Sequence, residues 1–66
     1  MGTYEKIAAY MADGQWHSTP EIANALHKVV PDVHRALMQA TKYRCVEKGD
    51  IVLENARYVR MWRLTP

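Results

Sequence analysis

Two side chains in the middle of the chain combine residue types and a spacing suited to hydrogen bonding along a polar ligand. Arg35 and Gln39 stand four residues apart, so on a helix they lie one turn apart on the same face. An arginine can donate two hydrogen bonds to guanine, and a glutamine can both donate to adenine and accept from it. An amphipathic helix also needs a polar outer face whatever it binds, so the pair has a plain structural explanation as well.

More hydrogen-bond donors flank this pair. His34, next to Arg35, can donate to a base or a phosphate. The candidates for phosphate contacts are Lys28, Lys42, Arg44, Arg57 and Arg60. The first three bracket the segment that holds Arg35 and Gln39. The other two lie near the end of an expected hairpin, where they could meet the minor groove or the sugar-phosphate backbone of a nucleic acid. The alternative is charge on solvated strands, which also protects a sheet edge from aggregation.

Charge is divided unevenly along the 66 residues. The net charge is +2, but residues 1–26 hold one base and three acids, whereas residues 27–66 hold eight bases and four acids. An anionic partner would therefore meet the second half of the chain.

Metal binding and catalysis are not expected. The candidate ligands His17, His27, His34 and Cys45 lack the paired spacing that brings two ligands to one metal ion, and Cys45 is expected to be a small buried hydrophobic residue entering a strand. The chain has no paired-carboxylate site, no nucleophile with a base nearby in sequence and no glycine-rich phosphate loop. We therefore expect no enzyme activity, no cofactor and no small-molecule substrate.

The length fits a single domain over residues 1–66 with a marginal core. Apolar residues make up 48% and charged residues 24% of the chain, which is ordinary for a globular protein. Apolar runs are far shorter than the roughly 20 residues that span a bilayer, and the first residues do not resemble a signal peptide. A cytoplasmic protein with no membrane segment is expected.

Helices are predicted to carry most of the candidate residues. The first begins with Thr3 as its N-cap and ends at Asp13-Gly14, because glycine readily takes the left-handed conformation that follows a helix. Trp16 is expected to insert its indole into the core from a brief extended segment, residues 15–17. The apolar face of the first helix is formed by Tyr4, Ile7, Ala8 and Met11.

The second helix has the clearest start in the sequence. Ser18 is a candidate N-cap, Glu21 stands three residues later to complete a capping box, and Pro20 suits the opening turn. The third helix is predicted from about Pro31 to Lys42. Its inward face is formed by Val33, Ala36, Leu37 and Ala40, and its outward face by Arg35, Met38, Gln39 and Lys42.

Extended structure is predicted from Tyr43 onward, where β-branched and aromatic residues become frequent. The last strand is the clearest, because Tyr58, Arg60, Trp62 and Leu64 alternate with the other residues of that segment. The hairpin spans residues 46–62. Gly49-Asp50 and Glu54-Asn55 are both candidate turns, and the sequence does not decide between them.

The predicted elements follow the order helix, short strand, helix, turn, helix, hairpin. Most of them lie in the segment WHSTPEIANALHKVVPDVHRALMQATKYRCVEKGD, closed by RYVRMWRLT. These residues, in this order, resemble the winged helix-turn-helix family of DNA-binding domains. The resemblance implies an α+β fold of three helices with a C-terminal β-hairpin wing, in which Pro31–Lys42 is the recognition helix and residues 46–62 are the wing. Such families commonly place Ser or Thr at the N-cap of the recognition helix. This chain has Val30 there, so a capping side chain and a phosphate contact are missing.

The resemblance and the charge pattern together predict sequence-specific binding of double-stranded DNA by a small transcriptional regulator, of the size seen in phages and mobile elements. The expected DNA-binding residues are Lys28, Pro31, His34, Arg35, Gln39, Lys42, Arg44, Arg57 and Arg60. A homodimer on a two-fold site would be the usual way for so small a domain to gain affinity. The alternative is a protein-interaction module on the same fold, such as an inhibitor or adaptor of phage type, in which Val29, Val30 and Met38 form an apolar patch.

Overall fold

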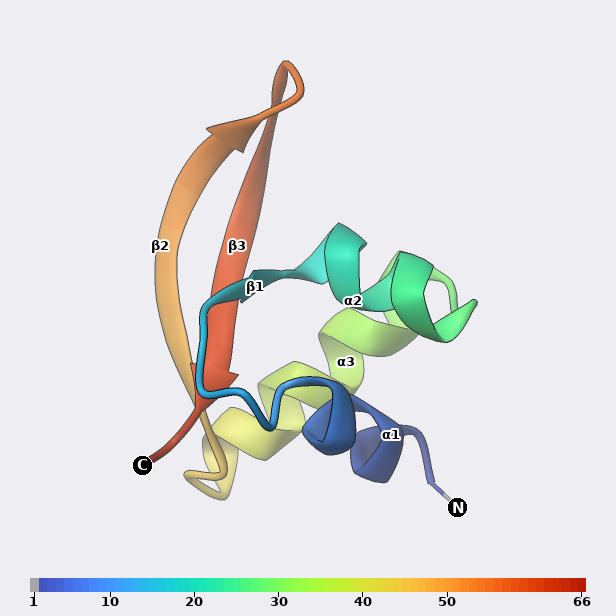
Figure 1. Ribbon diagram of the computed structural model, residues 1–66, viewed down its shortest axis with the longest axis vertical. Coiled ribbons are helices and arrows are strands. Elements are labelled where there is room, and N and C mark those ends of the chain that lie inside the picture. The colour runs from blue at the N-terminus through green and yellow to red at the C-terminus, as the bar shows by residue number, and fades with distance from the viewer. Residues whose placement is uncertain (1) are drawn as a thin grey trace.

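The computed structural model describes residues 2–66 as three helices and one small sheet (Figure 1). In chain order the elements are α1 (Thr3–Tyr10), β1 (His17–Ser18), α2 (Thr19–Leu26), α3 (Val30–Lys42), β2 (Val46–Glu54) and β3 (Arg57–Leu64). This is the predicted order. The fold is α+β with a three-stranded antiparallel sheet, an arrangement compatible with a winged-helix-like domain. Within residues 2–66, every helix is too short or too polar to cross a membrane.

The sheet has the strand order β1-β3-β2, so β3 is central and β2 forms an edge. The pairing of β2 with β3 runs from Val46 opposite Leu64 to Glu54 opposite Arg57. The turn of the hairpin is therefore Asn55-Ala56. Both residues have positive φ angles, 50° and 62°, as a two-residue turn that matches the twist of its strands requires. Of the two predicted turns, the structure has the one at Glu54-Asn55.

The other candidate turn, Gly49-Asp50, is a bulge within β2. Lys48 lies opposite Trp62 while Ile51 lies opposite Arg60, so the two residues between them oppose a single residue of β3. A side chain at Gly49 would clash with Trp16, because the Trp16 ring packs directly on the backbone there. A Cβ on Gly49 would lie 2.6 Å from Trp16 Cζ3.

The core lies between the three helices and the lower half of the hairpin. Trp62 of β3 is its largest fully buried side chain, and the indole N–H donates a 2.7 Å hydrogen bond to the hydroxyl of Thr19 at the start of α2. The other buried apolar residues are Ile7, Met11, Ile22, Ala23, Val33, Leu37, Ala40, Val46 and Val59. Burying a large apolar side chain contributes about 1.5–3 kcal/mol relative to leaving it exposed, so the burial of Trp62 is central to the domain.

The prediction that Trp16 fills the core is wrong. Trp16 is 40% exposed, because β1 begins at the residue after it. His17 and Ser18 are the residues that are buried beside β3. The indole instead covers the bulge at Gly49, and the guanidinium of Arg63 lies over it, 4.5 Å from the ring centroid.

Cys45 also differs from the prediction. It is exposed and precedes β2 instead of entering it. Its amide donates to the carbonyl of Ala40 in the turn that ends α3, which holds the backbone of Cys45 outside the strand and its side chain at the surface.

The helix starts are predicted with small shifts. The N-cap of α1 is Gly2 and not Thr3, and the N-cap of α3 is Val29 and not Val30. Neither cap residue offers its helix a side-chain acceptor, although the Gly2 amide donates a 3.4 Å hydrogen bond to the Glu5 carboxylate. Ser18 caps α2 as predicted, with its hydroxyl accepting a 3.2 Å hydrogen bond from the Glu21 amide. The predicted capping box is not formed within residues 2–66, because the Glu21 carboxylate bonds to His17 and Tyr10 instead of the Ser18 amide. Gly14 takes the left-handed conformation expected after α1, with φ at 73°.

Candidate nucleic-acid interface

Helix α3 turns one face into the core and the other to solvent. Val33, Leu37 and Ala40 are buried, and this three- and four-residue spacing is that of a single helical face. Arg35, Met38, Gln39 and Lys42 on the opposite face are exposed. The predicted division of the helix into an inward and an outward face is confirmed.

Arg35 and Gln39 lie together at the edge of α3 that faces α1. With Thr3, Asp32 and Ala36 they line a shallow, open hollow between the start of α1 and the exposed side of α3. Among residues 2–66, neither the guanidinium of Arg35 nor the amide of Gln39 has a hydrogen-bond or ion-pair partner. Both groups therefore remain available to an external ligand.

His34 lies on the other edge of α3, against the hairpin. It is exposed, yet its ring meets that of Trp62 edge to face with centroids 5.9 Å apart. It shares a groove between the helices and the hairpin with Arg57 and Arg60, and Val30 of α3 also lines this groove. The structure thus brings His34, Arg57 and Arg60 together, but on the side of α3 away from Arg35 and Gln39.

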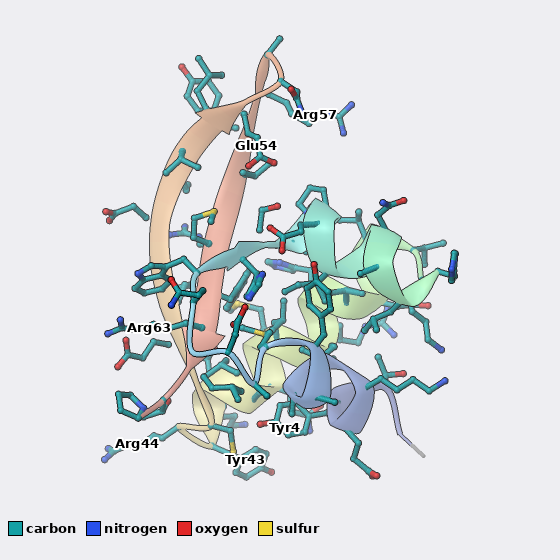
Figure 2. The ribbon with its side chains drawn as sticks, in the orientation of Figure 1. Tyr4, Tyr43, Arg44, Glu54, Arg57 and Arg63 are labelled. Atoms are coloured by element: carbon teal, nitrogen blue, oxygen red, sulfur yellow. The ribbon has the colours of Figure 1, made fainter. Side chains whose placement is uncertain are left out.

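Two arginines of β3 are partly engaged within the protein. Arg60 Nη1 donates a 2.8 Å hydrogen bond to the carbonyl of Gly49, across the bulge. Arg63 Nε donates to Glu47 at 2.7 Å while its guanidinium lies over Trp16. Arg57 lies by contrast at the far end of the hairpin, where Figure 2 shows its side chain extending into solvent near Glu54.

The remaining candidates lie at the two ends of α3. Pro31 is exposed in its first turn, and Lys28 is half-buried in the connection from α2. Lys42 is exposed in the last turn, and Arg44 follows with a positive φ of 61°. Figure 2 shows Arg44 and Tyr43 at the lower end of the molecule, far along it from Arg57. The predicted residues therefore fall into two groups. Along α3 and at its ends lie Lys28, Pro31, Arg35, Gln39, Lys42 and Arg44, whereas the groove between the helices and the hairpin is lined by His34, Arg57 and Arg60.

Exposed apolar side chains interrupt this polar surface. Around α3 they are Val29, Val30 and Met38, which are 60%, 43% and 41% exposed. On the far half of the hairpin they are Ile51, Val52, Leu53 and Tyr58. The first group was expected from the sequence but the second was not, because alternation in a strand does not reveal how far a hairpin extends beyond the helices that cover it.

A cluster around His17 is the other feature that sequence reasoning missed. Its Nε2 lies 2.9 Å from Asp13 Oδ1, and its Nδ1 forms a hydrogen bond with Glu21 Oε2. The hydroxyl of Tyr10 donates to the same Glu21 oxygen at 2.9 Å. Asp13, His17 and Glu21 are spaced by four residues, but they lie in a turn, a strand and a helix, so helical periodicity does not bring them together.

Neither this cluster nor any other group of His, Cys, Asp and Glu in residues 2–66 has an arrangement that could hold a metal ion.

Comparisons of the chain with protein-family models, with curated proteins and with solved structures each found no match. The case for a function therefore depends on the side chains themselves.

Proposed function

We propose that the protein binds double-stranded DNA as a small transcriptional regulator, with α3 in the major groove. The observation that carries the proposal is the outer face of α3, where Arg35 and Gln39 are exposed, one turn apart and without partners among residues 2–66. These two side chains can form paired hydrogen bonds with guanine and adenine, respectively.

The charges around α3 support this orientation. Lys42 and Arg44 at its C-terminal end and Lys28 before its start would face phosphates on either side of the groove. Asp32 is the one acid on the helix. It lies in the first turn, where its negative charge interacts favourably with the positive end of the helix dipole. Arg57 and Arg60 would meet the DNA backbone or the minor groove from the hairpin. A homodimer would present two α3 helices to a two-fold site.

Selection from random duplexes followed by binding across a salt series tests the proposal. We expect the Arg35→Ala, Gln39→Ala double variant to lose at least about tenfold in affinity for the selected site, since each paired base contact contributes about 1–3 kcal/mol of discrimination. Binding to unrelated duplexes should change much less. Ala25→Gln, an exposed substitution on α2, is the control for altered surface composition.

One result would refute DNA binding, and another would refute base recognition by α3. One is an affinity that does not fall between low and moderate salt, because phosphate contacts release counterions and must be salt-dependent. The other is equal binding of the selected site by the double variant and the unchanged protein.

A second candidate function is a protein-interaction module, favoured by the exposed apolar residues. Val29, Val30 and Met38 lie beside the polar face of α3, and apolar surface of this kind is typical of protein contacts. This function predicts a stable protein complex that Met38→Glu abolishes, with no retention on DNA. Gln39→Glu serves as the matched control, because it adds the same charge one residue away.

A further inference from the structure

His17 is a buried histidine held between two carboxylates. It is only 8% exposed, and its two ring nitrogens face Asp13 and Glu21. Asp13 belongs to the turn after α1, His17 to β1 and Glu21 to the first turn of α2. One imidazole therefore connects three consecutive segments of the chain.

The geometry specifies the protonation state of this ring. A carboxylate can only accept hydrogen bonds, so each ring nitrogen facing one must carry a proton. A neutral imidazole has a single N–H, and the arrangement is satisfied only by the imidazolium cation. After loss of a proton, one bare nitrogen would face a carboxylate oxygen, and both atoms would be acceptors.

The surroundings indicate which hydrogen bond would break first. The Glu21 carboxylate also accepts a hydrogen bond from Tyr10 of α1, whose ring lies 5.0 Å from the His17 ring. From β3, the residue opposite His17 is the uncharged Trp62. The Asp13 side chain is 51% exposed, against 39% for Glu21. Water can therefore replace His17 at Asp13 more readily than at Glu21.

We propose that His17 is a pH-sensitive clamp, which as a cation ties the turn after α1 to the start of α2 and which on deprotonation releases Asp13 while it keeps Glu21. This inference is independent of the proposed DNA binding. The consequence of deprotonation is local. Residues 11–16 would loosen at alkaline pH, whereas α2 and α3 would remain folded.

The direction of the pH effect follows from the charges. Burial by itself lowers the pKa of His17, but the hydrogen bonds to Asp13 and Glu21 outweigh it, so the pKa lies above its ordinary value. The hydrogen bond from His17 lowers the pKa of Asp13. For Glu21, burial raises the pKa, and the bonds from His17 and Tyr10 more than reverse this.

Because the pKa of His17 is higher in the folded state than in the unfolded state, protonation of His17 stabilises the fold. This stabilisation is complete at pH values below the pKa of an unfolded histidine, about 6.5. This stabilisation is lost as the pH rises through the folded pKa of His17. The two lowered carboxylate values act in the opposite sense, and their stabilisation is lost only as the pH falls below about 4. The clamp is therefore strongest in mildly acidic solution.

Nitrogen-15 NMR of the intact chain tests the protonation state directly. At pH 6 we expect both ring nitrogens of His17 to carry protons, and at high pH we expect Nε2 to lose its proton while Nδ1 keeps it. Amide exchange in residues 11–16 should accelerate over the same pH interval more than exchange in α3. A single neutral tautomer of His17 at pH 6 would overturn the proposal.

Variants give a second, independent measurement. We expect the midpoint of thermal unfolding to fall between pH 6 and pH 9, and Asp13→Asn to remove much of that fall, because the amide cannot stabilise a cation by charge. His27→Asn is the matched control, since His27 is exposed and left-handed and asparagine tolerates that conformation. An Asp13→Asn protein with the full pH dependence of the unchanged chain would contradict the clamp.

Discussion

The outer face of α3 and the far half of the hairpin are both exposed, yet they differ in chemistry. On α3 the polar side chains Arg35, Gln39 and Lys42 are exposed at helical spacing. The hairpin segment 51–58 holds one acid and one base, and Ile51, Leu53 and Tyr58 are more than half exposed. Phosphate recognition requires positive charge, whereas depletion of charge is typical of the centre of a protein interface. The two regions therefore suit different partners.

Their relation to the core differs as well, and this predicts the largest effect. Leu37 on the inner face of α3 is fully buried, whereas Leu53 of the hairpin is 63% exposed. We expect Leu37→Ala to lower the free energy of unfolding by about 2–5 kcal/mol, and Leu53→Ala to change it by no more than about 0.5 kcal/mol. Urea denaturation followed by circular dichroism measures both. A comparable loss of stability in the two variants would mean that the far half of the hairpin is covered in solution.

Charge neutralisation distinguishes the two regions in DNA binding. If α3 makes the main contribution, Lys42→Gln should reduce the slope of log affinity against log salt by about 0.9 for each phosphate that the lysine had neutralised. Arg57→Gln should reduce it less, because Glu54 lies directly opposite Arg57 and weakens the local positive potential. Fluorescence anisotropy with a labelled duplex at several salt concentrations gives the slopes. Equal reductions would place the hairpin tip on DNA as firmly as α3.

The smallest predicted effect tests whether the hairpin unfolds together with α3. Ala56 has a φ of 62°, a left-handed conformation that costs a residue with a Cβ about 1–2 kcal/mol. Glycine avoids this strain but adds flexibility to the unfolded chain, so Ala56→Gly should stabilise the protein by about 0.5 kcal/mol. The midpoint of thermal unfolding should rise by a few degrees.

Ala25→Gly is the comparison for that measurement. Ala25 is exposed within α2, where glycine costs about 1 kcal/mol, so this variant should melt lower. If Ala56→Gly leaves the midpoint unchanged while Ala25→Gly lowers it, the tip of the hairpin opens before the rest of the domain.

Local signals in the sequence were sufficient for the helices but not for the placement of the aromatic residues. The Ser18 cap and the two faces of α3 follow from spacing alone, because caps and helical faces depend on neighbours within one or two turns. Trp16 and Trp62 are equally apolar by type. Which indole is buried depends on the pairing of β1 with β3, which joins residues more than 40 positions apart.

The candidate site shows the same limit. The exposure of Arg35 and Gln39 was predictable from the helical period, whereas their separation from His34, Arg57 and Arg60 was not. That separation depends on how the hairpin crosses the helices, which no local pattern encodes. The spacing of Asp13, His17 and Glu21 was visible in the sequence, but only the turn after α1 explains why the three side chains meet.

The free edge of β2 has a consequence for the protein at high concentration. An open strand presents unpaired amides and carbonyls on which another chain can add a strand. Near the base of the hairpin, Glu47, Lys48, Asp50 and the bulge oppose such addition, because charge and irregular backbone interrupt a regular ladder. The next three residues, Ile51-Val52-Leu53, carry no charge and favour extended structure. Intermolecular β-aggregation of this chain would therefore begin at these three residues.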